Sequence, residues 1–206
     1  VGSSIYYGGY ETNWMWADGE MAYCANPSLA TPPPGDYDRS PLAAPSGRTA
    51  EVIADLWFGY GSPGFDESLW PSRWYDGSAM SDNNYAALTH ILVSDTYTSD
   101  GDQALYGCTE EFKQWVRYNV LGFDTSGQVA NPNATGRLIA ARSGEVPDNF
   151  EAFQLYTGGS TQIILSFEYT PYGEIALKKG SALPEISGSN PCYSLEGAIY
   201  DVYSDS

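Results

Sequence analysis

The chain has 206 residues, and its 26 acidic and 9 basic side chains give it a formal net charge of −17 near neutral pH. This length suits one mid-sized domain, alone or with part of a second domain. The few basic residues are scattered along the chain, which argues against nucleic acids and anionic membranes as partners. No apolar run approaches the ~20 residues that a membrane-spanning helix needs, so we expect no membrane insertion.

The composition does not favour metal or cofactor sites. The chain has a single histidine, and its three cysteines show no C-x-x-C spacing. Protein zinc sites are built mainly from clusters of these two residue types. We therefore expect neither a metal ion nor a cofactor.

The N-terminal part of the chain predicts strands followed by a long loop. Aromatic stretches in the first 25 residues are separated by the turn signals Gly8-Gly9 and Asp18-Gly19, a pattern typical of short antiparallel strands. Proline and glycine punctuate residues 26–47, most densely at Pro32–Gly35, and they indicate a loop.

The middle of the chain predicts a block of helices. Thr49, either Ser81 or Asp82, and Thr109 each precede apolar residues at helical spacing, and serine, threonine and aspartate are residue types that cap helix N-termini. Two acidic residues follow Thr109 directly, and negative charge is favourable in the first turn of a helix. Three helices are therefore expected between two strand-forming regions.

The C-terminal half predicts strands again, over Arg137–Ala141, Phe150–Thr157 and Thr161–Tyr169. The order of strands, helices and strands indicates an α+β fold. We expect a sandwich-like or barrel-like β core, built from N- and C-terminal strands, with an inserted helical block. Residues 1–172 are assigned to this domain, and residues 173–206 to a strand-forming tail.

Two short motifs resemble those of bacterial surface thioester domains. The first is Tyr23-Cys24-Ala25, an aromatic residue, a cysteine and an apolar residue, followed by the proline-rich loop. The second is Thr161–Leu165, which contains Gln162 followed by three apolar residues. Thr161 departs from the family's pattern, which has an apolar residue there. The two motifs lie in the family's order, on either side of the helical block.

This resemblance implies an internal thioester bond between Cys24 and Gln162. A thioester reacts readily with amines, because a thiol is a far better leaving group than an amine. The implied partner is a lysine of a host surface or matrix protein, or a small amine. The protein would then be a covalent adhesin and not an enzyme. It would act as a monomer at the tip of a longer virulence-associated protein, anchored in a Gram-positive cell wall.

Other residues are candidates for supporting roles. His90 is the only imidazole and hence the only ready general base near neutral pH, although a hydrogen-bonded histidine at the edge of the core is the alternative. Tyr23 is a candidate for shielding the bond from water. If Cys24 is in a thioester, Cys108 and Cys192 remain, and they either pair with each other or Cys192 pairs outside this chain.

The tail has a resemblance of its own. Ile175–Lys179 and Leu195–Tyr203 resemble the opening of a collagen-adhesin B-type (prealbumin-like) repeat. Such stalk domains carry a Lys–Asn isopeptide bond, and the resemblance matches Lys178 or Lys179 to its lysine. The matching asparagine would lie beyond Ser206, and a purely structural role for both lysines is the alternative.

Two other functions remain open from the residues alone. A non-covalent carbohydrate-binding adhesion module is suggested by the tryptophans, and it would bind glycans reversibly without Cys24. A cysteine hydrolase or acyltransferase would use Cys24 and His90 and would turn over its substrate. The tryptophans form two groups in the sequence, Trp14 and Trp16, then Trp57, Trp70 and Trp74.

Overall fold

A computed structural model describes residues 2–171 of the chain. Within the first compact unit, Val1–Thr170, strands and helices pack around shared apolar cores. The predictions for the tail lie outside the described residues. They concern the B-type repeat, Lys178, Lys179 and Cys192.

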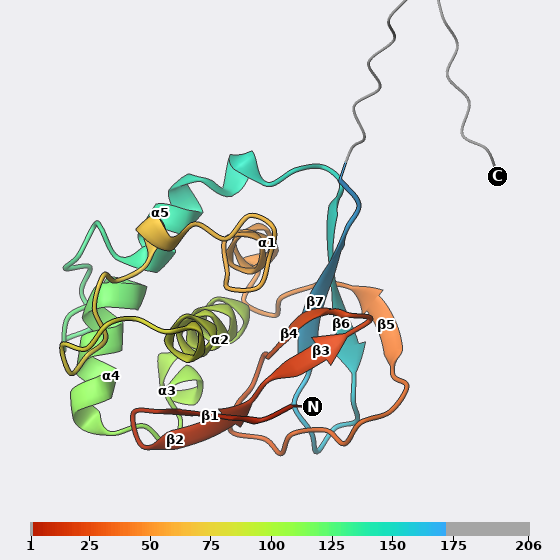
Figure 1. Ribbon diagram of the computed structural model, residues 1–206, viewed down its shortest axis with the longest axis horizontal. Helices are drawn as coiled ribbons and strands as arrows, with labels where there is room; N and C mark the ends of the chain where they lie inside the picture. Colours follow the sequence, from red (N-terminus) through yellow and green to blue (C-terminus); the bar gives the residue numbers. More distant parts are fainter. Residues whose placement is uncertain (1, 172–206) are drawn as a thin grey trace, which may run out of the picture. The chain divides into compact units, whose positions relative to one another are not determined.

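The described strands form two antiparallel sheets (Figure 1). A hairpin pairs β1 with β2, and a five-stranded sheet has the order β3-β4-β7-β6-β5. The strands are β1 (Ser4–Tyr7), β2 (Tyr10–Asn13), β3 (Met15–Ala17), β4 (Glu20–Cys24), β5 (Asp38–Pro41), β6 (Phe150–Tyr156) and β7 (Ile164–Tyr169).

The larger sheet brings the two ends of the domain together. Strand β4, from the N-terminal part, pairs with β7, from the C-terminal part, and the helices of the intervening segment cover one face of the sheet (Figure 1). The predicted α+β class is therefore confirmed. The sheet is open, because β3 and β5 lie at its two edges and are not paired with each other, so these strands form no closed barrel.

The helical block surrounds one central helix. Helix α2 is buried on nearly all sides, and between Tyr85 and Tyr97 only Asp95 is more than slightly exposed. No helix within residues 2–171 is both long and apolar enough to cross a bilayer. The helices are α1 (Thr49–Trp57), α2 (Asp82–Thr98), α3 (Gly101–Ala104), α4 (Glu110–Val116), α5 (Thr135–Ala141), a π-helix (Arg117–Leu121) and two 3-10 turns (Glu67–Leu69 and Ser143–Glu145).

The three predicted helices are confirmed, and two of them begin at the expected caps. The Ser81 hydroxyl accepts a hydrogen bond from the backbone N–H of Asn84, in a capping box. The Thr109 hydroxyl accepts one from the N–H of Phe112. Thr49 is instead the first residue of α1, and its hydroxyl accepts a hydrogen bond from the N–H of Ala44 in the preceding loop.

The strand predicted over Arg137–Ala141 is wrong, because these residues belong to helix α5. A short apolar run is compatible with either a buried strand or a buried helix, and its period does not separate them. Packing decides here: α5 lies against α1 and the π-helix, with Ile139 fully buried.

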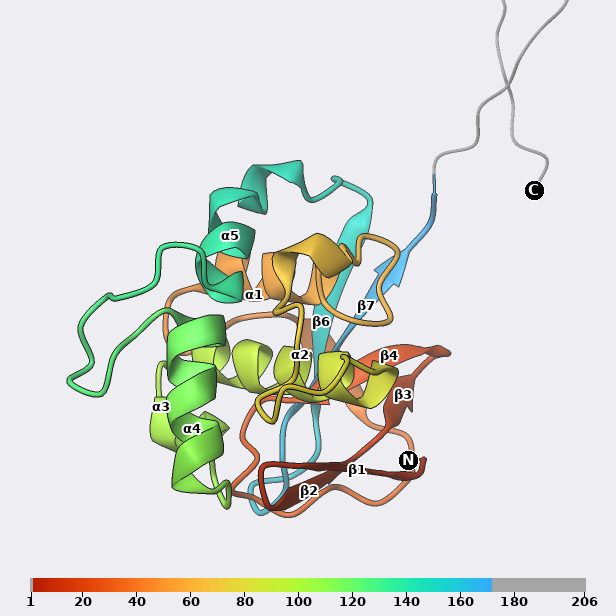
Figure 2. The same ribbon diagram turned by 60° about the vertical axis from the view of Figure 1, so that its left-hand side comes forward.

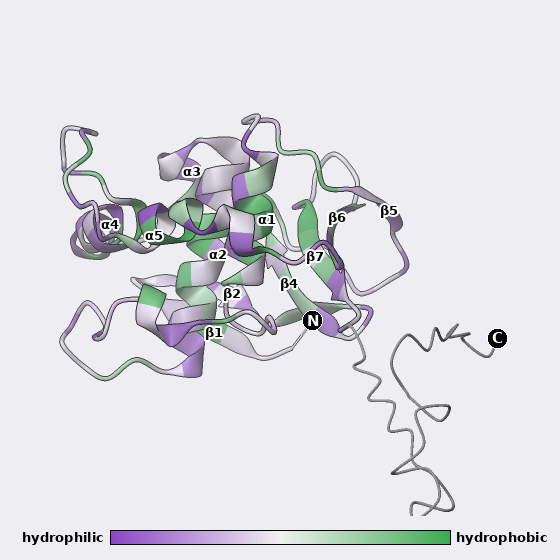
Figure 3. Ribbon diagram, turned by 90° about the horizontal axis from the view of Figure 1, so that it is seen from above, coloured by the Kyte–Doolittle hydropathy of each residue, from purple (hydrophilic) through white to green (hydrophobic). Residues whose placement is uncertain are grey.

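An apolar layer joins the helices to the sheet. Tyr23 of β4 and Leu165 and Phe167 of β7 pack with Leu56 of α1 and Val93 of α2. Figure 3 shows that the apolar residues are concentrated on these same elements. Each large side chain buried in this layer contributes about 1.5–3 kcal/mol, so the layer adds substantially to the domain's stability.

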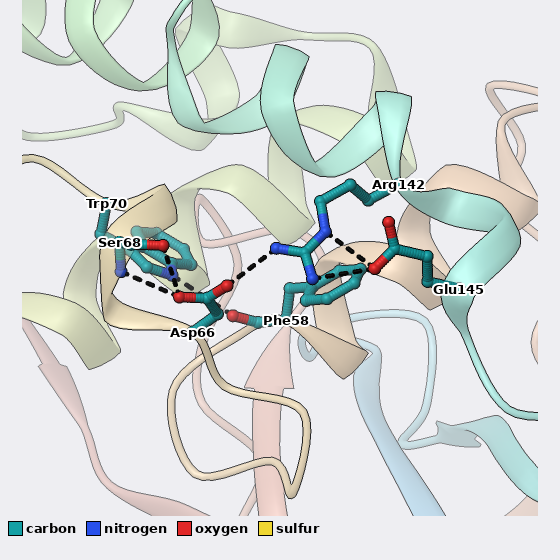
Figure 4. A network of polar contacts seen from close by, with 6 residues as sticks. All are labelled: Phe58, Asp66, Ser68, Trp70, Arg142 and Glu145. Carbon is teal, nitrogen blue, oxygen red and sulfur yellow. Dashed lines mark hydrogen bonds and ion pairs between the residues drawn. The ribbon is translucent and has the colours of Figure 1, made fainter.

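The glycine-rich segment after α1 is held in place by a polar network around Arg142 (Figure 4). The guanidinium contacts Asp66 at 2.8 Å and Glu145 at 2.8 Å, and it lies 4.6 Å from the centroid of the Phe58 ring. Asp66 also accepts hydrogen bonds from the N–H and hydroxyl of Ser68. Hydrogen bonds from Ser68 and Arg142 therefore lower the pKa of Asp66.

The turn of the first hairpin depends on glycine. Gly8 and Gly9 have φ values of +53° and +87°, as a tight two-residue hairpin turn requires. Figure 2 shows this hairpin beside the start of α4, where the N–H of Thr109 donates to the carbonyl of Gly8 at 2.6 Å. A Cβ atom at Gly8 would overlap the ring of Phe112, which is fully buried.

We expect Gly8→Ala to lower the free energy of unfolding by about 2–4 kcal/mol, since an unfavourable φ and overpacking both contribute. Gly127→Ala is the matched control, because Gly127 has φ +77° but nothing within 4 Å of an added Cβ. It should cost only about 1 kcal/mol. Urea unfolding of both variants measures the difference. Equal losses of unfolding free energy would show that the Phe112 ring moves aside at little energetic cost.

Candidate functional site

The candidate site lies where β4 ends and β7 begins. Cys24 is the last residue of β4 and is paired in register with Ile164, the first residue of β7. The pairing continues beyond the strands, because the N–H of Ala25 donates to the carbonyl of Ile163 at 2.8 Å. Antiparallel pairing therefore sets residues on either side of Ile164 next to Cys24.

The loop after β4 fixes the backbone around Gln162. The backbone N–H of Gln162 donates to the carbonyl of Ala30 at 3.0 Å, and the backbone carbonyl of Gln162 accepts a hydrogen bond from the Thr157 hydroxyl. The neighbouring N–H of Ile163 donates to the Asn26 side chain at 2.8 Å. Two hydrogen bonds thus hold this short stretch against the loop, and a third, from Thr157, comes from the connection between β6 and β7.

The same loop orients the Gln162 side chain. Its amide nitrogen donates to the carbonyls of Leu29 at 2.7 Å and Pro27 at 3.3 Å. The Pro27 carbonyl also accepts a hydrogen bond from the Tyr10 hydroxyl at 2.8 Å. With the nitrogen held by carbonyls, the oxygen side of the amide faces Cys24.

Cys24 and Gln162, which are 138 residues apart, are in direct contact through Sγ and Oε1. The cysteine is 0% exposed and the glutamine 3% exposed. Burial raises the pKa of the Cys24 thiol well above its usual range, so the thiol is protonated near neutral pH. The pair is a buried thiol set against the carbonyl side of a carboxamide.

The model of the thioester domain family matches residues 1–122 of the chain, a stretch that includes Cys24. This chain belongs to the thioester domain family. Gln162 lies beyond the matched residues, so its place in the site rests on the contacts described above. No match was found among the curated proteins.

Two solved structures are similar to this thioester domain. The N-terminal thioester domain of a surface protein from Clostridium perfringens is 17% identical, with 71% of this chain and 79% of that chain covered and a TM-score of 0.42. The N-terminal domain of the Streptococcus pyogenes pilus tip adhesin Cpa is also 17% identical, with 79% and 85% covered and a TM-score of 0.46.

Tyr23 and His90 lie on the other side of the sheet from Cys24. Successive residues of a strand point to opposite faces, and the Tyr23 side chain enters the helical layer, where its hydroxyl donates to the carbonyl of Tyr60. The His90 ring packs edge-on against Tyr23, with 6.2 Å between centroids. The expected shielding by Tyr23 is therefore wrong for the face on which Cys24 lies.

His90 is also poorly suited to act as a base. It is 2% exposed, its Nε2 atom has no hydrogen-bond partner within the described structure, and burial lowers its pKa to about 4. The expected position at the edge of the core is wrong, because His90 lies in the fully buried middle of α2. The thioester domain thus holds a neutral imidazole in its interior.

The remaining predicted residues have structural positions. Cys108 is buried next to α4 and has no disulfide partner among residues 2–171, and the question of its pairing with Cys192 lies outside them. Trp70 and Trp74 are core residues, at 5% and 7% exposure. Residues 2–171 contain no cluster of metal-binding side chains.

Sequence reasoning missed the loop that holds Gln162. The carbonyls of Pro27, Leu29 and Ala30 accept hydrogen bonds from Gln162, and the Asn26 side chain accepts one from the neighbouring N–H of Ile163. The Asn-Pro dipeptide directly after the cysteine motif is a turn signal. Backbone carbonyls carry no signature in a sequence, so only Asn26 could have been found in this way.

We expect Asn26→Ala to lower the free energy of unfolding by about 1–2 kcal/mol, because the N–H of Ile163 loses its acceptor. Asn26→Asp keeps an oxygen at this position and should stay closer to the parent protein. Urea unfolding compares the two variants. Equal losses in both would show that the hydrogen bond to Ile163 does not stabilise the site.

Proposed function

We propose that this thioester domain forms an internal bond between Cys24 Sγ and Gln162 Cδ, and uses it to attach covalently to an amine. The observation that carries the proposal is the buried contact between the Cys24 thiol and the Gln162 amide. Membership of the thioester domain family supports it. The fold holds two groups together that would react very slowly if they met by diffusion.

Bond formation requires a proton transfer. The Cys24 sulfur attacks Gln162 Cδ, the C–N bond breaks, and the thiol proton leaves with the nitrogen as ammonia. The thiol is protonated at the start, so proton transfer accompanies the formation of the C–S bond. The carbonyls of Pro27 and Leu29 accept hydrogen bonds from this nitrogen, and they favour the additional positive character that it gains on leaving.

The bond is then consumed by an amine. The amine nitrogen attacks Gln162 Cδ, the C–S bond breaks, and a proton from the nitrogen passes to the Cys24 sulfur. The products are an amide and a thiol, and no step regenerates the thioester. The domain therefore acts once, as a binding protein and not as an enzyme. A covalent link removes the dissociation step that limits ordinary adhesion.

The proposed setting is the outside of a Gram-positive cell. There the domain would be a monomer at the tip of a longer protein that is anchored in the cell wall, and its partner would be a lysine of a host surface or matrix protein. The net charge of −17 supports an attraction for cationic side chains.

The rival functions have less support. Two of the tryptophans that suggested a carbohydrate-binding surface, Trp70 and Trp74, are in the core, and only Trp16, at 51% exposure, is largely open to solvent. A hydrolase would need a base beside Cys24, whereas His90 lies across the sheet among the helices.

The proposal is tested by the intact mass of the freshly purified protein under denaturing conditions. A domain with the bond is lighter than its sequence by one ammonia, and methylamine treatment adds one methylamine to that lighter mass. A full mass, with Cys24 open to alkylation after unfolding, would contradict the proposal.

A further inference from the structure

A cavity of about 300 Å³ lies on the face of the sheet opposite the helices. The segment Pro32–Tyr37 forms one wall as it leads into β5, and Figure 1 shows that this part of the chain runs along the side of the sheet away from the helices. The opposite wall is apolar and comes from three strands of the sheet. Its residues are Met15, Ala17, Leu155 and Ile164.

This cavity adjoins the buried pair. Met15 and Ile164 line it, and both belong to the apolar cluster that contains Cys24. The Met15 Sδ atom is 3.8 Å from Cys24 Sγ, and Ile164 is the register partner of Cys24. These two residues therefore lie between the cavity and the sulfur, and the Met15 side chain is an unbranched, flexible thioether.

The charged lining of the cavity suits a cation. Asp18 and Asp36 contribute carboxylates. The single cationic residue of the lining, Arg39, is paired with Glu168 through both of its terminal nitrogens and lies over the Phe153 ring, 3.9 Å from the centroid. Because its charge is already compensated, the lining is negative overall. Negative charge raises the local concentration of cationic ligands.

Aromatic residues complete the lining. Trp16 and Tyr37 both border the cavity, and aromatic rings bind alkylammonium groups as well as alkyl chains. A cavity with an apolar wall, two carboxylates and two aromatic residues matches a side chain that ends in an ammonium group on an apolar stem. Among the standard amino acids, this description fits lysine.

We propose that this cavity, the approach groove, binds the lysine side chain of the protein partner and leads it to the thioester. The inference rests on the proposed function. The ammonium binds near Asp18 and Asp36 and loses one proton to water. The resulting amine passes Met15 and attacks Gln162 Cδ, the C–S bond breaks, and the second proton moves to the Cys24 sulfur as the amide forms.

The experiment compares two nucleophiles on the intact thioester. Butylamine resembles the lysine side chain and is cationic near neutral pH, whereas hydroxylamine is uncharged there. Intact mass against time gives the rate constant for each. We expect Asp18→Asn and Asp36→Asn each to slow the reaction with butylamine about threefold, as for the loss of one nearby charge at a hydrated surface. The reaction with hydroxylamine should keep its rate.

Asp148→Asn is the matched control. Asp148 is exposed and lies just before the start of β6, whereas Leu155, which lines the groove, lies near the end of that strand. It should leave both rates unchanged. If Asp148→Asn slows butylamine as much as the groove variants do, net charge accounts for the effect and the groove is excluded. If Asp18→Asn and Asp36→Asn leave the butylamine rate unchanged, or slow both nucleophiles equally, the groove is excluded as well.

These outcomes are distinct from a failure of the proposed function. A parent protein that has its full mass and reacts with neither nucleophile would exclude the proposed thioester itself. A parent protein that lacks one ammonia and reacts with both nucleophiles, at rates that do not depend on Asp18 or Asp36, would exclude only the proposed role of the approach groove.

Discussion

Cys24→Ala is expected to have the full mass of its sequence and to form no adduct with methylamine, whereas the parent domain lacks one ammonia. The variant has no sulfur to attack Gln162 Cδ, so the Gln162 amide remains. Because the reaction is a single covalent event, the expected effect is complete loss rather than a reduced rate. The difference is read directly from intact masses.

Gln162→Glu tests the other partner. A carboxylate in place of the amide has no leaving group that the buried Cys24 thiol could displace, and so this variant should also have its full mass and a free thiol after unfolding. The side chain has nearly the same size, and the contacts with Pro27 and Leu29 are the only ones that the change disturbs directly.

Cys108→Ala is the matched control for the loss of a cysteine. Cys108 is buried, as Cys24 is, but it lies beside α4. This variant should keep the mass deficit and react with methylamine at the parent rate. A mass deficit that persists in Cys24→Ala and disappears in Cys108→Ala would show that Cys108 forms the bond, and would overturn the assignment to Cys24.

Two buried groups are expected to make opposite contributions to the dependence of the domain's stability on pH. Asp55 of α1 is 3% exposed, and its Oδ2 atom has no partner within the described structure. Burial raises the pKa of Asp55 from 3.8 to about 7, although the Thr96 hydroxyl and Arg48 act in the opposite direction. His90 is the reverse case, since burial lowers its pKa from 6.5 to about 4.

The sign of each effect follows from the proton that each state binds. Folded Asp55 keeps a proton that the unfolded chain releases, so stability is lost as pH rises from about 4 to about 7, by about 4 kcal/mol in all. In the folded protein His90 stays neutral at pH values where the unfolded chain binds a proton on it. Stability is therefore lost as pH falls from 6.5 to about 4, by about 3 kcal/mol.

In the parent protein these two opposite slopes nearly cancel between about pH 4 and pH 6.5. Single variants should reveal them. Relative to the parent, Asp55→Asn should gain stability as pH rises through this range, and His90→Gln should lose it. Urea unfolding at several pH values measures both profiles, and the exposed Asp148→Asn serves as the control. Parallel profiles for all four proteins would contradict the assigned pKa shifts.

Periodicity and caps predicted most of the fold, because they are local properties. Ser81 and Thr109 cap helices at the expected places, and the strands at both ends of the domain pair with each other, as their order suggested. The error at Arg137–Ala141 arose where a short apolar run had no cap to identify it. There the packing of Ile139 against α1 and the π-helix selected the helix.

The sequence by itself determined the order of the elements, the acidic surface and the two motifs that contain Cys24 and Gln162. Residues far apart in the chain carry no record of which face of a strand they share. Only the tertiary structure therefore placed Cys24 in contact with Gln162, and showed that the opposite face of β4, with Tyr23, packs against His90 and the helices. It also showed that backbone carbonyls of the Asn26–Ala30 loop orient the amide, because a carbonyl acquires a direction only when the chain is folded.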